Sequence, residues 1–154
     1  MTNWIDLKKL IPGLNKGQWI HVVKSPLNPL VTALRENDFS VFFIDGAVIN
    51  DSKSFFQHVK KVFNFPDYFG ENWDAWSECL GDFKMSLTGP TAIVWIDADK
   101  TFMSDAKVFV QAVIDLYNMA LSAGSTSTDQ THQVELFLIG NVQGFKNVLD
   151  FEKE

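Results

Sequence analysis

Apolar residues gather in four short runs along the 154-residue chain, each bounded by glycine, proline or polar residues, and these runs predict four strands. Residues 91–96 are apolar after a threonine and follow Gly89-Pro90, which is typical of a central strand buried on both faces. Residues 40–44 are also apolar, so we expect a second buried strand there. The other two predicted strands cover residues 18–23 and 134–139.

Two longer stretches repeat apolar residues at intervals of three and four, the period of one helix face. In the first, Asp51 or Ser52 is suited to cap the start, and Pro66 is expected to end the helix. The second covers residues 104–122, has Ser104 as its expected cap, and is the longest predicted helix. Shorter helices are predicted over residues 3–10 and, beginning at Pro29, up to residue 36.

Strands that alternate with helices predict an α/β fold, because parallel strands need a crossover connection between them. We expect a small parallel sheet of three to four strands with helices packed on it. The chain is 46% hydrophobic over 154 residues, which is enough to bury a full core in a single domain spanning residues 1–154.

The composition also bears on the compartment. Cys79 is the one cysteine, so no intramolecular disulfide can form, and its apolar spacing beside Leu80 favours a buried side chain over a nucleophile. No apolar run approaches the roughly 18 residues of a membrane span, and the N-terminal residues lack the apolar core of a secretory signal. We therefore expect a cytoplasmic protein that does not enter a membrane.

Negative charge is concentrated in one window of the sequence. The formal net charge is −6, and residues 62–83 contain five carboxylates without any Lys or Arg. This window therefore carries −5 and the rest of the chain about −1. With a pI of about 5.0 and no basic cluster, the chain lacks the Lys and Arg that hold phosphates. We expect no direct binding of nucleic acid, and a basic partner instead.

A helix that begins near Asn72 would place Asp74, Glu78 and Asp82 on one face, because these residues follow one another at intervals of four. Like charges at that spacing destabilise a helix by roughly 0.2–0.5 kcal/mol per pair, so folding alone does not favour the pattern. Two interpretations stay open on the charge pattern alone: an acidic binding face, or the solvated side of an amphipathic helix.

The residues around these carboxylates are expected to have structural roles. Trp73, Trp76 and Leu80 fall at i, i+3 and i+7, so we assign them to the core first and to an interface second. Gly70 is expected to take a positive φ before the helix, and Asn72 to cap it.

One motif lies inside the acidic window: Pro66, then Tyr68-Phe69-Gly70-Glu71-Asn72-Trp73-Asp74-Ala75, then Glu78-Cys79-Leu80. This motif resembles the signature of the barstar family of ribonuclease inhibitors, and the order of the predicted elements agrees with that family. The resemblance covers about residues 40–140 and implies a barstar-like layered arrangement of helices on the sheet. Residues 1–39 would then be an N-terminal extension with a strand and a helix, and residues 141–154 a short tail.

The resemblance implies a protein that plugs the active site of a small secreted or toxic ribonuclease, as an antitoxin does, with helix carboxylates in place of RNA phosphates. Position by position, Asp74 and Glu78 fall on the two carboxylates that enter the nuclease, and Tyr68 on an aromatic residue of the preceding loop. It implies no catalytic residue and no cofactor, and we expect a monomer when free. The full set of expected partner-binding residues is Tyr68, Glu71, Asp74, Ser77, Glu78 and Asp82.

Three positions depart from the best-known member of the family. Ser77 stands where that protein has an interface tryptophan, and Glu78 where it has the shorter aspartate. Lys107 stands near a further acidic contact of the long helix, with its charge reversed. These departures leave the nuclease unidentified.

Two alternatives compete with the inhibitor interpretation. The first is a barstar-like module that binds another basic protein, such as a toxin that is not a nuclease. The second is a Mg²⁺-dependent phosphatase, because Asp97-Ala98-Asp99-Lys100-Thr101 follows a predicted strand and fits the pattern DxDxT. No second acidic pair follows a later strand, so Asp97 or Asp99 could instead cap the next helix. The three histidines, His21, His58 and His132, show no metal-binding spacing.

Overall fold

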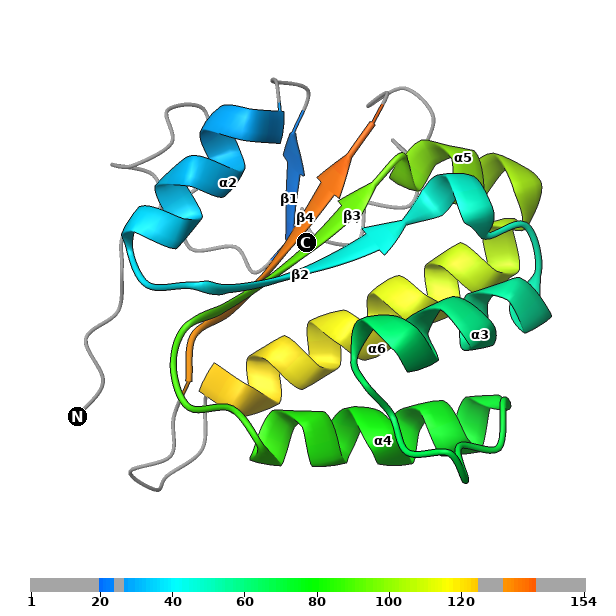
Figure 1. Ribbon diagram of the computed structural model, residues 1–154. Coiled ribbons are helices and arrows are strands. Elements are labelled where there is room, and N and C mark those ends of the chain that lie inside the picture. Colours follow the sequence, from blue (N-terminus) through cyan, green and yellow to red (C-terminus); the bar gives the residue numbers. More distant parts are fainter. Residues whose placement is uncertain (1–19, 24–26, 125–131, 141–154) are drawn as a thin grey trace.

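The computed structural model describes residues 20–23, 27–124 and 132–140, and within them four parallel strands form one sheet of order β1-β4-β3-β2 (Figure 1). The strands are β1 (Ile20–Val23), β2 (Ser40–Asp45), β3 (Thr91–Ile96) and β4 (Val134–Ile139). The helices are α2 (Leu27–Glu36), the 3₁₀ helix η1 (Gly46–Val48), α3 (Ser52–Val62), α4 (Trp73–Met85), α5 (Ala98–Ser104) and α6 (Ala106–Gly124). The expected α/β class and parallel sheet are confirmed. The helix expected over residues 3–10 and the expected tail lie outside the described residues.

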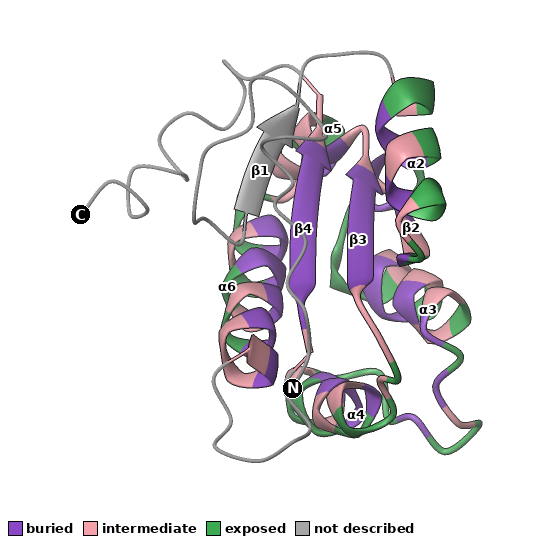
Figure 2. Cartoon of the chain, turned by 90° about the vertical axis from the view of Figure 1, so that its left-hand side faces the viewer, coloured by how far each residue is buried: buried purple, intermediate pink, exposed green. Residues whose placement is uncertain are grey.

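The two inner strands carry the core. In β3 and β4 the first five residues are buried, because both strands have a neighbour on each edge and helices on each face (Figure 2). The central position expected for residues 91–96 is therefore confirmed. β2 differs, since it lies at the edge of the sheet and Ile44 is its one buried residue. The expectation of a buried strand there is wrong, because an edge strand has a neighbour on one side only.

The sheet separates two apolar clusters. Leu30 and Leu34 of α2 pack with Phe137 on one face, while α3, α4 and α6 pack on the other face around Trp95 (Figure 1). Strands β1 and β2 lie at opposite edges of the sheet, and the chain connects them through α2 on one face. From β2 the chain runs back to β3 and then to the adjacent β4, and the connecting helices lie on the other face. Because crossover connections are right-handed, helices move to the other face of the sheet when the chain begins to add strands in the opposite direction.

Helix α3 begins and ends with specific local contacts. The Asp51 side chain accepts a hydrogen bond from Ser54 N at 2.8 Å in a capping box, so Asp51 is the cap. At the other end, Asn64 takes a left-handed conformation with φ 54°, and Phe65 N donates to Lys60 O at 2.9 Å in a Schellman-type turn. The helix therefore ends before Pro66 is reached, and the expectation that Pro66 ends it is wrong.

The long helix also differs from its expected start. Ser104 is the last residue of the separate helix α5, and the cap of α6 is Asp105, whose Oδ1 accepts Val108 N at 3.2 Å. The hydroxyl of Ser104 and the carboxylate of Asp105 are both capping groups, so the sequence did not distinguish them. Similarly, α2 begins at Leu27, which puts Pro29 inside its first turn.

Within the described ranges, no helix combines the length and the apolar character that crossing a membrane requires.

Candidate functional site

Helix α4 starts where the sequence predicts. The Asn72 side chain accepts a hydrogen bond from Ala75 N at 2.8 Å, and its amide donates to Gly70 O at 3.1 Å. The positive φ of this turn belongs to Glu71 at 49°, so the expectation of a positive φ at Gly70 is wrong. A Cβ at Gly70 would lie 3.0 Å from the Asn72 amide nitrogen, so a side chain there would press on the residue that caps α4.

The inner side of α4 is aromatic and buried. Trp76 is fully buried, Leu80 is buried beside it, and Trp73 is half-buried with its ring stacked on Phe55 at 5.6 Å. The expected core assignment of these three α4 residues is confirmed. Cys79 is buried as well, and this burial, with Asp82 and Glu78 nearby, raises the pKa of its thiol.

Two long-range hydrogen bonds hold α4 against α6. The Trp76 indole donates to Asp115 Oδ2 at 3.0 Å, and Lys84 Nζ donates to Ser122 Oγ at 2.9 Å. Gln111 Nε2 also donates to both carboxylate oxygens of Asp115, each at 3.1 Å. These contacts fix the rotation of α4, and with it the direction of the opposite face. Sequence reasoning missed Asp115, because its partner is 39 residues away and no local pattern links the two.

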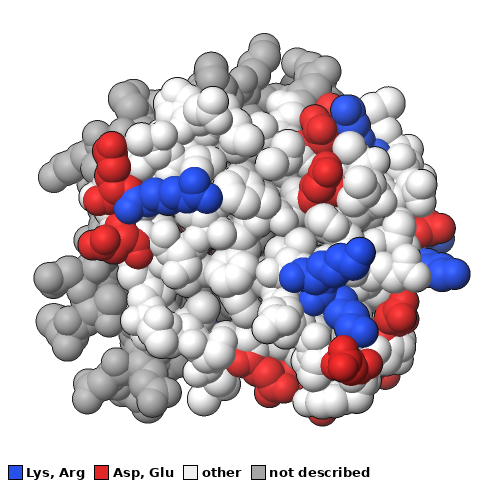
Figure 3. All heavy atoms as spheres, viewed as in Figure 1, with Lys and Arg blue, Asp and Glu red and all other residues white. Residues whose placement is uncertain are grey.

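The outer side of α4 is acidic and free. We call Asp74, Glu78 and Asp82 the acidic face of α4; all three are exposed. Figure 3 shows acidic side chains along the lower edge of the molecule, where α4 lies in Figure 1. Within the described ranges the one ion pair is Lys100–Asp97, so no cation there neutralises the acidic face.

The other expected contact residues lie around this face. Glu71 and Ser77 are exposed, and Tyr68 is 81% exposed although it is aromatic. Met85, at the far end of α4, is 70% exposed and was not singled out from the sequence. A groove of about 240 Å³ runs between α4 and α6, and its α4 side is lined by Ser77, Leu80, Gly81 and Lys84.

Lys107 lies apart from the acidic face. It is in the first turn of α6, eight residues before Asp115, which corresponds to roughly 12 Å along the helix. The pairs Trp76–Asp115 and Lys84–Ser122 show that α4 and α6 run in the same direction. Lys107 therefore precedes the stretch of α6 that lies beside α4.

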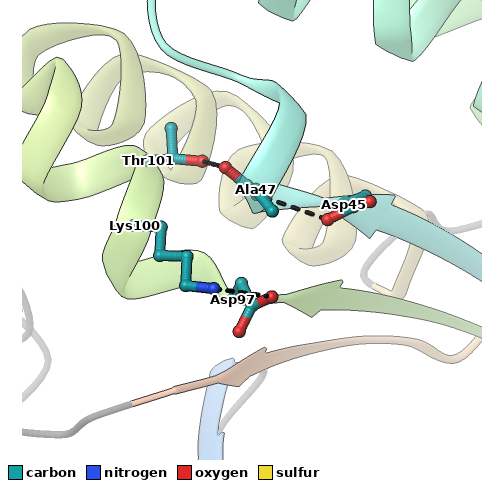
Figure 4. Close-up of polar contacts among 6 residues, drawn as sticks. Asp45, Ala47, Asp97, Lys100 and Thr101 are labelled. Atoms are coloured by element: carbon teal, nitrogen blue, oxygen red, sulfur yellow. Dashed lines mark hydrogen bonds and ion pairs between the residues drawn. The ribbon is translucent and has the colours of Figure 1, made fainter.

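The residues of the DxDxT pattern take part in the connection from β3 to α5 (Figure 4). Asp97 has φ 51° and precedes α5, but its side chain makes no capping hydrogen bond; instead Oδ2 lies 3.5 Å from Lys100 Nζ. Thr101 is fully buried and its hydroxyl donates to Gly46 O at 3.0 Å. Gly46 has no room for a side chain, because a Cβ would overlap the Asp97 carbonyl. Side-chain capping by Asp97 is thus not observed.

We call Asp45, Gly46, Asp97, Lys100 and Thr101 the strand-end cluster. Its contacts join the ends of β2 and β3. A group of three or more His, Cys, Asp or Glu side chains able to hold a metal ion is not found in the part of the chain that the structure describes.

Comparison with known proteins adds one match. The family model described as barstar (barnase inhibitor) matches residues 39–138. The curated proteins include no match to the chain.

Proposed function

The chain belongs to the barstar family, and from this membership we propose that it inhibits a ribonuclease by covering the enzyme's basic active site with the acidic face of α4. A ribonuclease must bind a polyanion, so its active site is lined with cationic side chains. A row of carboxylates on a helix is electrostatically complementary to such a site.

The observation that carries the proposal is that the acidic face is exposed and unpaired within the described residues, while the inner side of the same helix is rigidly held. Asp74 and Glu78 are proposed to enter the active site, with Glu71 and Asp82 at the two ends of the row. Tyr68 would contact the enzyme beside them. Ser77 would leave room for a partner side chain in the groove next to α6.

The proposal needs no catalytic residue and no cofactor in this chain, and it describes a monomer that becomes part of a complex. We further propose that the protein works in the cytoplasm, since the free Cys79 thiol is suited to a reducing compartment. Residues 1–154 are proposed to form one domain, of which the family match covers 39–138.

A second candidate is a binding module for a basic protein that is not a nuclease. The groove beside Ser77 favours it, because a partner of different shape could use this space. Both candidates use the same acidic face, so only enzyme inhibition separates them.

The test measures cleavage of a fluorogenic RNA by barnase, which the family description names, and by a panel of small basic ribonucleases. We expect inhibition of at least one enzyme at a one-to-one ratio, and loss of this inhibition at high salt. Tight binding of a basic protein with no effect on RNA cleavage would favour the second candidate. If neither binding nor inhibition is found with any of these enzymes, the proposal is wrong for this class of partner.

A further inference from the structure

A groove of about 430 Å³ lies between the end of α3 and the loop that precedes α4. Lys60 and Lys61 line it from α3, and Asp67 and Glu71 line it from the loop. Figure 3 shows basic and acidic side chains close together on the face that carries these two helices. Glu71 is also an expected partner contact, so the groove adjoins the proposed binding surface. The remaining lining residues are Gln57, Asn64 and Phe65.

The backbone holds both lysines in place. Lys60 O accepts Phe65 N at 2.9 Å and Lys61 O accepts Asn64 N at 3.4 Å, in the turn that ends α3. Phe65 is buried and its ring lies 5.7 Å from that of Phe63. The backbone of both lysines is therefore fixed by hydrogen bonds at the edge of the groove.

None of the four charged groups is held in an ion pair with a described residue. Within the described ranges, neither Lys60 nor Lys61 forms an ion pair, and the same holds for Asp67 and Glu71. Lysines in the last turn of a helix are favoured by the helix dipole, which is a purely structural reason for their presence. That reason does not account for their position on a groove beside unpaired carboxylates.

These cations have a consequence for binding. A partner that is basic throughout would bring like charge to Lys60 and Lys61 while its cations approach Glu71 and Asp74. The groove and the contact residue are adjacent, so the repulsion falls within the ~8 Å Debye length of physiological salt. Like charges brought together at an interface disfavour a partner as effectively as opposite charges favour one.

We propose that Lys60 and Lys61 form a selectivity edge of the binding surface, which accepts a protein whose basic site is bordered by a carboxylate and rejects one that is basic throughout. This inference rests on the proposed function, since it assumes that the acidic face of α4 receives the basic site. Asp67 and Glu71 on the facing wall repel any anion, and they oppose RNA, which carries a charge at every nucleotide, more strongly than a single protein carboxylate.

The test uses two fluorescein-labelled peptides: a run of six arginines, and the same run extended by a glycine linker and two aspartates. Their dissociation constants are measured by fluorescence anisotropy for the wild type and for Lys60→Glu with Lys61→Glu. The matched control, Arg35→Glu with Lys53→Glu, changes the net charge equally at two exposed cations outside the groove. The readout is the ratio of the two dissociation constants, in which effects of net charge largely cancel.

In the groove variant we expect the affinity for the aspartate peptide to fall relative to that for the all-arginine peptide by about five- to tenfold, as for the loss of two exposed ion pairs. In the control variant we expect this ratio to change by less than about twofold. Equal shifts in both variants would overturn the selectivity edge. If the all-arginine peptide binds Asp74→Asn with Glu78→Gln as well as it binds the wild type, the proposed function fails instead. An RNA oligonucleotide that binds the wild type but not the groove variant would assign the lysines to nucleic acid and also overturn the inference.

Discussion

The acidic face of α4 and the strand-end cluster both contain carboxylates, but those of the acidic face are exposed and unpaired among the described residues, whereas the polar groups of the strand-end cluster contact one another. Asp74 and Glu78 point to solvent, and no described cation pairs with them. In the strand-end cluster, Asp97 pairs with Lys100 and the Thr101 hydroxyl is buried against Gly46 O. Residue types in a motif are therefore a weak guide to function, because neighbouring groups decide whether a side chain is still available.

The difference follows from where the two regions lie. The strand-end cluster sits where β2, β3 and α5 converge, so its polar groups meet each other and the backbone. Helix α4 packs by one side against α3 and α6, and the carboxylates of its other side are exposed among the residues that the structure describes. Each of the following changes tests one side of this contrast.

The largest expected effect comes from removing the anchor of α4. Trp76→Ala should lower the free energy of unfolding by about 3–5 kcal/mol, because a fully buried tryptophan leaves a cavity and Asp115 loses its indole donor and keeps only Gln111. Trp76→Phe keeps most of the ring and should cost about 1–3 kcal/mol for the lost hydrogen bond. Urea unfolding followed by circular dichroism measures both, and equal losses would show that the hydrogen bond rather than packing holds the helix.

Changes to the acidic face should affect binding strongly and stability little. Asp74→Asn with Glu78→Gln should weaken binding to an inhibited ribonuclease by about 2–5 kcal/mol, a range partly set by complexes of this same family. Stability should change by less than about 0.5 kcal/mol, because removing the like-charge pair offsets the loss of the Asp74 carboxylate from the first turn of α4, where the helix dipole favours it.

The matched control for this variant is Glu36→Gln with Asp38→Asn, which removes two exposed charges at the end of α2 and just beyond it. Titration calorimetry should find near-wild-type affinity for it. An equal loss in the control would mean that net charge, rather than the acidic face, determines binding.

In the strand-end cluster the effects should be confined to stability. Thr101→Val removes the buried hydroxyl donor and leaves the Gly46 carbonyl with the Ile49 N–H at 3.3 Å, so it should cost about 0.5–1.5 kcal/mol of unfolding free energy. Asp97→Asn breaks only a partly exposed ion pair and should cost less than about 1 kcal/mol. Ribonuclease binding should be unchanged in both variants. Hydrolysis of a phosphate ester with Mg²⁺ that Asp97→Asn abolishes would contradict this assignment and revive the phosphatase.

A smaller effect concerns pH. His58 Nε2 accepts the Asp45 backbone N–H at 2.8 Å, which a protonated imidazole cannot do. Burial, and to a lesser degree Lys61, lowers the pKa of His58 below its usual 6.5, although Asp45 opposes this shift. The unfolded chain therefore binds the proton more readily than the folded chain. The stability from His58 is present above pH 6.5 and is lost as the pH falls from there through the lowered pKa.

This prediction is checked by urea unfolding at pH values on both sides of 6.5, with His58→Gln as the comparison. Glutamine can accept the same N–H at every pH, so the wild type should lose more stability on acidification than the variant does. Parallel pH profiles would show that the histidine hydrogen bond makes no contribution.

Several elements of the fold were predictable from local patterns. The apolar runs at 91–96 and 134–139 match β3 and β4 residue for residue. Asn72 caps α4 as expected, and Asp51, one of the two expected caps, begins α3. The errors share one cause. Where two neighbouring residues could do the same job, as Ser104 and Asp105 or Gly70 and Glu71, the choice depends on packing that the local sequence does not contain. The edge position of β2 likewise depends on the strand order.

The sequence by itself determined the four strands and most of the helices, but not the separate helix α5. It also determined the start of α4 and the spacing that puts its carboxylates on one face, because caps and periodicity act over a few residues. Only the tertiary structure decided which carboxylates stay free. It pairs Trp76 with Asp115 across 39 residues, satisfies Asp97 and Thr101 within the strand-end cluster, and places Lys60 and Lys61 on a groove beside Glu71. Such contacts join distant parts of the chain, so they arise only when the whole fold brings those parts together.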